Sequence, residues 1–216
     1  MASVGADFVW RMEDVLDLYA KLYNADRPVV CFDELPFQLL ADKRAPQPVA
    51  AGRPARVDYE YRRQGTANLF LCFEPLAGWR HVEVTARRTN KDFAEQMRAL
   101  VDDHYPDAPV IAVVLDNLST HSPAALYQTF SPSEARRLVQ RLEFHYTPKH
   151  GSWLNMAELE LAILSRQCLG RRLPDPTVLQ RETAAWEAER NRIRAKAHWH
   201  FTTTQARSKL RRLYPA

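Results

Sequence analysis

Apolar residues recur at two spacings along this chain, and the spacing predicts how helices and strands alternate. From residue 6 to residue 24 they follow a helical period, which predicts an amphipathic connector helix. Later runs predict strands at 28–33, 68–75, 79–87, 110–115 and 143–147, and helices at 90–104, 123–130, 133–142, 153–169 and 177–196. This order is typical of an α/β fold in which a mixed sheet is flanked by helices.

The stretch from residue 35 to residue 63 interrupts the alternation. It is rich in Pro, Ala, Gly and Arg, which predicts a long irregular excursion. Tyr59 and Tyr61 lie among its basic residues, a mixture that suits a surface following a nucleic-acid backbone, although ordinary exposed loops can look similar. The basic residues of this stretch are Arg44, Arg53, Arg56, Arg62 and Arg63.

Composition limits the class of protein. A chain of 216 residues has room for one large domain with an appendage, and we divide it into a connector helix (1–27) and a main domain (28–216). The net charge of +4 suits a polyanionic partner without requiring one. The three cysteines lie far apart in apolar segments, which indicates reduced core thiols. No membrane span or signal peptide is evident, so we expect a cytoplasmic protein with no membrane partner.

Three acidic residues occupy positions where they could share a metal ion. Asp33 and Asp116 each close an apolar run, and Glu158 lies at the start of a predicted helix. Reactive groups gather at strand ends in sheets of this kind. Because hard divalent cations take oxygen ligands, carboxylates converging from two strands and a helix indicate phosphodiester chemistry.

Each acid also has a simpler interpretation. An Asp after a strand can cap a turn. Glu34 follows Asp33, and strand alternation turns the two to opposite faces, so we expect only one to share a site with Asp116. Glu158 fits a capping box that starts at Asn155, and Glu160 is a rival ligand on the same helix. Periodicity leaves these alternatives open.

Polar and basic residues near the acids are candidate DNA contacts. Asn117 and His121 follow Asp116, and Lys149 and His150 precede the third acid. Turn-forming residues and solvated loop side chains are the alternatives for all four. Arg62 and Arg63, at the end of the basic excursion, complete the expected nucleic-acid-binding set.

Three motifs carry a family resemblance. These are Phe-Asp-Glu at Asp33, Leu-Asp-Asn-Leu-Ser-Thr-His at Asp116, and Thr-Pro-Lys-His-Gly-Ser-Trp-Leu-Asn-Met-Ala-Glu at Glu158. From about Val29 to the C-terminal Leu-Arg-Arg-Leu-Tyr-Pro, the chain resembles DDE transposases of bacterial insertion sequences related to the Tc/mariner superfamily. Met156 stands where the family's Asn-Pro-x-Glu element has proline. The resemblance implies an RNase H-like fold, with Asp33, Asp116 and Glu158 as catalytic and metal-binding residues.

The same resemblance implies a transposase catalytic domain that cleaves phosphodiesters and transfers strands. Mg²⁺ is the implied cofactor, with Mn²⁺ as a substitute and two ions roughly 3.5–4 Å apart. Transposon ends and target DNA are the implied partners, a homodimer is a candidate assembly, and the bacterial nucleoid is the implied location. A structure-selective nuclease and a non-catalytic DNA-binding or dimerisation remnant are the alternatives. Because one connector-like helix precedes Asp33, we expect a catalytic domain alone, with weak and nearly sequence-blind DNA binding.

Overall fold

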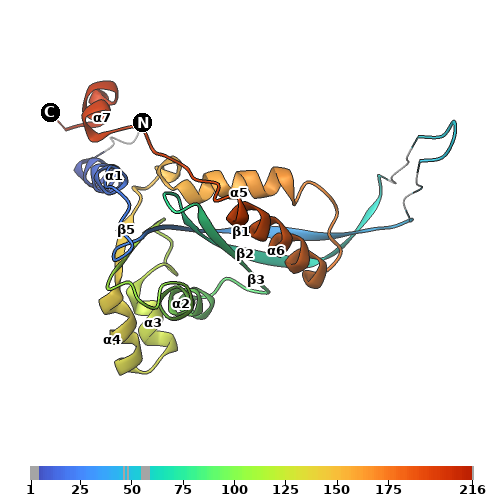
Figure 1. Ribbon diagram of the computed structural model, residues 1–216, viewed down its shortest axis with the longest axis horizontal. Helices are drawn as coiled ribbons and strands as arrows, with labels where there is room; N and C mark the ends of the chain where they lie inside the picture. The colour runs from blue at the N-terminus through green and yellow to red at the C-terminus, as the bar shows by residue number, and fades with distance from the viewer. Residues whose placement is uncertain (1–4, 46, 48, 55–58, 216) are drawn as a thin grey trace.

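A mixed five-stranded sheet forms the centre of the molecule (Figure 1). The computed structural model describes residues 5–45, 47, 49–54 and 59–215. The strand order is β3-β2-β1-β4-β5; β1 pairs antiparallel with β2 and parallel with β4, β2 pairs antiparallel with β3, and β4 pairs parallel with β5. The strands are β1 (Val29–Asp42), β2 (Tyr61–Glu74), β3 (Trp79–Thr85), β4 (Ile111–Leu115) and β5 (Leu142–Tyr146). The predicted α/β fold with a mixed sheet is therefore confirmed.

Helices cover both faces of the sheet (Figure 1). Three of them start where a polar N-cap precedes a proline, as Ser122, Ser131 and Asp175 do, because the cap satisfies a free backbone N–H and proline lacks one. The helices are α1 (Ala6–Tyr19), α2 (Asn90–Ala99), α3 (Pro123–Thr129), α4 (Pro132–Arg141), α5 (Met156–Gln167), α6 (Pro176–Arg192) and α7 (Thr203–Lys209). Shorter turns are a π-helical turn at Leu100–His104 and 3₁₀ turns at Ser152–Leu154 and Arg211–Leu213.

The sheet separates two hydrophobic cores. Strand alternation sends Cys31 of β1 and Val114 of β4 to the core under α1, α5 and α6, whereas Phe32 and Leu115 enter the core under α2, α3 and α4. All five residues of β4 are buried, as expected for a central strand. The parity of a residue in β1 or β4 thus decides which layer of helices its side chain meets.

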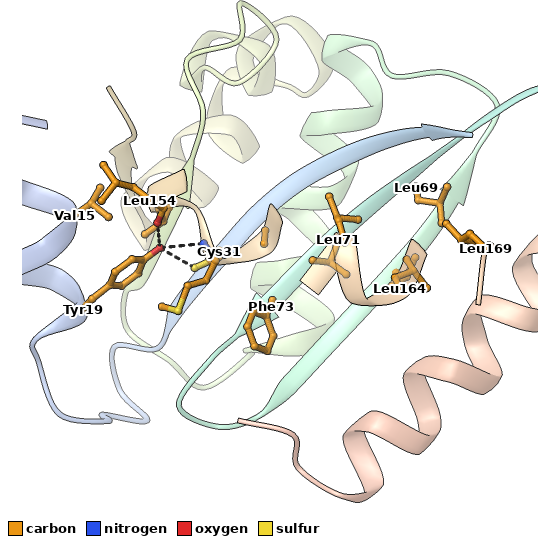
Figure 2. Close-up of a cluster of buried hydrophobic side chains, with 14 of the residues drawn as sticks. Val15, Tyr19, Cys31, Leu69, Leu71, Phe73, Leu154, Leu164 and Leu169 are labelled. Carbon is orange, nitrogen blue, oxygen red and sulfur yellow. Dashed lines mark hydrogen bonds between the residues drawn. The ribbon is translucent and has the colours of Figure 1, made fainter. Parts of the chain in front are cut away.

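Tyr19 joins three segments inside the first core (Figure 2). Its hydroxyl donates to the Leu154 carbonyl oxygen at 2.8 Å and lies 3.2 Å from the Cys31 sulfur, so α1 is fastened to β1 and to the turn before α5. Burial raises the pKa of the Cys31 thiol to about 12. All three cysteines are buried and free, which confirms the expectation of reduced core thiols.

The irregular excursion predicted from residue 35 to residue 63 is wrong at both of its ends, where residues 35–42 and 61–63 form strands. β1 continues to Asp42 and β2 begins at Tyr61, and the two pair along a ribbon that projects from the body (Figure 1). On β2 the outer residues 61–66 are all exposed, so they show no alternation of buried and exposed positions, whereas the outer part of β1 is mostly half-buried. β4 pairs only with residues 29–31 of β1, and the unpaired edge beyond them tolerates Pro36. Arg56 lies outside the described residues.

Smaller differences concern helix ends and the N-terminal helix. α1 ends at Tyr19 instead of residue 24, and Thr89 rather than Asn90 caps α2. α1 also buries Met12 and Leu16 in the first core, so it packs as part of the fold, while the boundary drawn at residue 28 stays a prediction.

Among the described residues, no helix combines the length and apolar character that crossing a membrane requires.

A buried ion cluster holds α5, β3 and α6 together. The Glu160 carboxylate is 1% exposed and accepts hydrogen bonds from the Arg190 guanidinium at 2.7 and 3.1 Å. Arg80 Nε lies 3.0 Å from the same carboxylate, and this arginine also donates to the carbonyl oxygens of Gly78 and Ala195. The negative charge of Glu160 is therefore compensated by two arginines inside the protein.

We expect Glu160→Gln to lower the free energy of unfolding by about 3–5 kcal/mol, because it leaves two arginines without their buried counter-charge. Thermal and urea unfolding measure the loss. Glu189→Gln is the matched control, since it breaks an exposed pair with Arg192 on α6 and should leave the unfolding curve unchanged. Equal losses in the two variants would contradict a structural role for the cluster.

Candidate active site

Asp33 and Asp116 lie side by side at the edge of the parallel strands. The last paired residues of β1 and β4 are Cys31 and Val114, and each Asp lies two residues further along. Two residues restore the same face of a strand, so Asp33 lies on the face of Cys31, under α1, α5 and α6. Asp116 directly follows β4, and its charge contributes to the raised pKa of Asp33. The register of the two strands brings these two acids together.

Asp33 is half-buried and lacks a cationic partner among the described residues. Its Oδ1 accepts from the backbone N–H of Glu34 at 2.8 Å, and Asn155 Nδ2 stands 3.5 Å from its Oδ2. Burial raises the pKa of the Asp33 carboxyl to about 7, and the charges of Asp116, Glu158 and Glu34 contribute to the rise. Burial and neighbouring negative charge both oppose ionisation, so the site favours the arrival of a positive charge.

Glu158 is an exposed residue in the first turn of α5, and it does not cap the helix. The Asn155 side chain accepts from the Ala157 N–H at 3.1 Å, while the Asn155 N–H donates to the Ser152 carbonyl oxygen at 2.7 Å. The second bond of a capping box is therefore replaced by a backbone bond. Asn155 Nδ2 also donates to the Phe32 carbonyl oxygen at 2.9 Å, which fastens this helix start beside Asp33.

Asp116 is connected to the opposite face of the sheet through a histidine. His121 Nδ1 lies 2.6 Å from Asp116 Oδ1, and its Nε2 lies 2.7 Å from Glu34 Oε2. Burial lowers the pKa of His121, but the hydrogen bonds to the two carboxylates outweigh it and raise the pKa to about 9. The ring is therefore a cation at neutral pH. Glu34 faces away from Asp33, as expected, and it is linked to Asp116 through His121.

The donor set suits a hard divalent cation. Three carboxylates would supply oxygen ligands. Burial is the main cause of the raised pKa of Asp33, and the negative charges of the neighbouring acids add to it. In the described part of the chain, no three His, Cys, Asp or Glu side chains already converge as closely as a bound metal requires. Acids that repel one another are expected to close only around a cation, so Asp33, Asp116 and Glu158 would be its holders.

The expected DNA contacts lie in different places. Lys149 and His150 are exposed on a tight turn closed by the bond from the Gly151 N–H to the Pro148 carbonyl oxygen, 2.8 Å long. The Thr147 N–H donates to the Leu115 carbonyl oxygen at 2.9 Å, so this turn starts beside the strand that ends before Asp116. Exposed Asn117 lies at the same edge.

The other expected contacts are separated from that edge. Arg62 and Arg63 are exposed on the projecting ribbon. Arg63 pairs with Leu40, which lies seven residues beyond Asp33, about 23 Å at roughly 3.3 Å per residue. His121 is 1% exposed and both its ring nitrogens are hydrogen-bonded, so we do not retain it as a DNA contact.

Two residues beside the acids carry parts of the site that sequence reasoning did not assign. The sequence gives Asn155 a capping role and a place in the Asn-x-x-Glu element, but it does not predict the bond from Asn155 to the Phe32 carbonyl oxygen. Strand alternation predicts that Glu34 lies on the opposite face of β1 from Asp33. Nothing in the linear sequence indicates that the His121 side chain contacts Glu34.

The sheet order is that of an RNase H-like domain. Asp33 and Asp116 at the ends of two neighbouring parallel segments, with Glu158 at the start of α5, form a candidate carboxylate active site. Residues 28–180 match the model of a family described as DDE superfamily endonuclease, and the chain belongs to that family. The DDE part of the resemblance drawn from the three motifs is thereby confirmed. No curated protein matches the chain.

Solved structures of Mos1 share the fold. The Mos1 mariner paired-end complex with Mn is 15% identical, with a TM-score of 0.58 over 88% of this chain and 58% of that one. The Mos1 strand transfer complex is 16% identical, with a TM-score of 0.58 over 88% of this chain and 56% of that one. A pre-cleavage Mos1 transpososome is 14% identical, with a TM-score of 0.56 over 90% and 64%. The chain thus spans less than two thirds of the length of these relatives.

The raised pKa of Asp33 predicts that this residue destabilises the metal-free fold. Its folded-state pKa of about 7 lies above the ordinary 3.8, so the penalty is absent below pH 3.8, grows as the pH rises, and is complete above about pH 7. We expect Asp33→Asn to raise the melting temperature at pH 8 by several degrees, since one pKa unit is about 1.36 kcal/mol and 1 kcal/mol shifts a chain of this size by roughly 2–4 °C.

Calorimetry in chelator at pH 8 and pH 5 checks this expectation. The gain should shrink at pH 5, where Asp33 is largely protonated in the folded protein. Asp107→Asn, at an exposed position, removes the same charge without relieving a buried one and is the control. A gain that is the same at both pH values would contradict the assignment of the penalty to Asp33.

Proposed function

We propose that this chain is the catalytic domain of a DNA transposase that cleaves phosphodiesters and transfers strands. One observation carries the proposal: in a member of the DDE endonuclease family, Asp33 lies on β1 and Asp116 directly follows the neighbouring parallel strand β4, close enough for its charge to raise the pKa of Asp33. Glu158 joins them as the third ligand, because it is exposed and free of any capping bond. Its rival Glu160 is committed to two arginines.

The proposed cofactor is Mg²⁺, for which Mn²⁺ can substitute, and the site would hold two ions. Bound there, the ions would activate the attacking water or 3′-hydroxyl and stabilise the leaving oxygen. The protein's part is to hold the ligands. Asp33 gives up a proton when a cation binds, since its pKa is about 7 without one, so cation affinity should rise with pH. Asn155 keeps the start of α5, and with it Glu158, against β1 beside Asp33.

DNA is the proposed partner. Lys149, His150 and Asn117 are exposed at the sheet edge that carries Asp116, where they can contact phosphates near the reacting bond. Arg62 and Arg63 extend the basic surface along the ribbon. Mos1 was solved in a paired-end complex with Mn and in a strand transfer complex, which supports a divalent cation and transposon-end DNA as proposals for this chain. A homodimer remains part of the proposal.

A nicking and joining assay tests the function. The wild-type chain should nick a supercoiled plasmid in Mg²⁺ or Mn²⁺ and join a supplied duplex with a free 3′-OH to it. Asp116→Asn and Glu158→Gln should reduce both reactions to the level without metal, because each removes a ligand charge while leaving the buried core intact.

Glu160→Gln is the matched control on the same helix, and at low temperature it should retain most activity despite its lower stability. An active Glu158→Gln protein would remove Glu158 from the triad. Nicking without joining would indicate a structure-selective nuclease, and a wild-type chain inactive in both reactions would contradict the proposal.

The projecting ribbon should contribute to DNA affinity by charge alone. Replacing Arg62 and Arg63 together by Ala should weaken binding of any duplex and reduce the slope of log K against log salt by about 1.8, because each phosphate contact contributes about 0.9. Fluorescence anisotropy over a salt series measures the slope. Ala at both Arg211 and Arg212, an adjacent exposed pair near the C-terminus, removes the same charge and should change the slope less. Equal slopes for the two variants would show that the ribbon has no special role.

A further inference from the structure

We propose that Glu34 and His121 are positioning residues, which fix the Asp116 carboxylate so that one of its oxygens is held inside the protein and the other can bind a divalent cation. The inference rests on the proposed function, in which Asp116 is a metal ligand. It adds two residues from the opposite face of the sheet to the machinery of the site.

The contacts form a chain from the interior to the surface. The side chains of Glu34 and His121 are 4% and 1% exposed, whereas that of Asp116 is 36% exposed. His121 Nε2 lies 2.7 Å from Glu34 Oε2, and its Nδ1 lies 2.6 Å from Asp116 Oδ1. The Leu118 N–H donates to the same Oδ1 at 3.2 Å. Since both bonds fall on Oδ1, the geometry leaves Oδ2 of Asp116 for a ligand.

The imidazole itself is fixed in place. It meets Phe32 edge-on at a ring-centroid distance of 5.4 Å and packs on Phe93 at 5.0 Å. The backbone on either side is also held, because the Tyr146 hydroxyl donates to the His121 carbonyl oxygen at 2.9 Å and the His121 N–H donates to the Leu118 carbonyl oxygen at 3.0 Å. With both ring nitrogens hydrogen-bonded to carboxylates, His121 is not a metal ligand in this arrangement.

Stability alone does not account for this pair. Removing a carboxylate and an imidazole from water is costly, and apolar residues of similar size often serve a core as well or better. Arg88 stands 3.7 Å from Glu34, too far to replace His121 as its close partner. Groups that hydrogen-bond a ligating side chain orient it, and their loss typically costs about 10–100-fold in metal affinity. Orientation of Asp116 is therefore the role that the geometry indicates.

The chain contains a matched control. His145 bridges two carboxylates in the same manner, at 2.8 Å to Asp14 and 3.1 Å to Glu143, but neither acid belongs to the site. A change at His145 removes an equivalent bridge without touching Asp116. Comparing the two histidines separates positioning of the ligand from the general effect of losing a buried histidine.

The test replaces the pair by apolar residues, as Glu34→Leu with His121→Phe, so that no charge is left buried alone. Mn²⁺ is titrated into the full chain and free Mn²⁺ is followed by electron paramagnetic resonance, with melting temperatures measured in parallel. We expect the apparent Kd for Mn²⁺ to rise about 10–100-fold at an unchanged or higher melting temperature. His145→Phe should bind Mn²⁺ as the wild type does, and nicking by the double variant should recover at high Mn²⁺.

Unchanged Mn²⁺ affinity in the double variant, or an equal loss in His145→Phe, would overturn the inference. If the double variant does not fold, Glu34→Gln keeps the size of the side chain and one acceptor oxygen; a several-fold weaker affinity for Mn²⁺ supports the inference, and wild-type affinity refutes it. Asp116→Asn separates the two levels. If it binds Mn²⁺ as the wild type does, the proposed metal site fails. If it loses binding while the double variant does not, only the positioning role fails.

Discussion

The parallel register between β1 and β4 is the constraint on which the site depends. It aligns Cys31 with Val114, so Asp33 and Asp116, each two residues further along its segment, lie at the same edge of the sheet. Because the side-chain period of a strand is two, a slip of one residue would turn Asp33 toward α2–α4 and bury it among apolar side chains. Asn155 fastens α5 to the same part of β1, because its side-chain amide donates to the Phe32 carbonyl oxygen and so keeps Glu158 near Asp33.

The acids differ in how their charge is compensated. The difference distinguishes acids that stabilise the fold from the acid that is expected to bind a cation. Glu160 lies between two arginines, so its charge is satisfied by the fold. Glu34 is satisfied by a histidine that in turn holds Asp116. Asp33 has no such partner among the described residues, and burial, together with the charges of the acids around it, raises its pKa to about 7. A fold that stores such a charge gives up stability at neutral pH and is expected to regain it when a cation binds.

The central part of the fold could be predicted from local pattern because its strands are apolar and its helices carry caps and prolines. The 110–115 run was expected to be a buried central strand, and β4 occupies 111–115 with every residue buried. The ribbon formed by β1 and β2 could not be predicted in this way. Its polar residues form strands because the two segments pair with each other, although 18 residues separate Asp42 from Tyr61. Local strand propensity does not reveal a partner that lies so far along the chain.

The sequence by itself determined the core strands and the three motifs, because each depends on residue type and short spacing. It left Glu158 and Glu160 as rivals, since both lie on a helix with apolar residues on two sides. Only the tertiary structure decided between their environments, by bringing Arg80 and Arg190 to Glu160 from β3 and α6. It likewise gave His121 its two partners, Asp116 and Glu34. Charges that meet across separate elements are determined by how the elements pack, and packing is a property of the whole fold that no local spacing encodes.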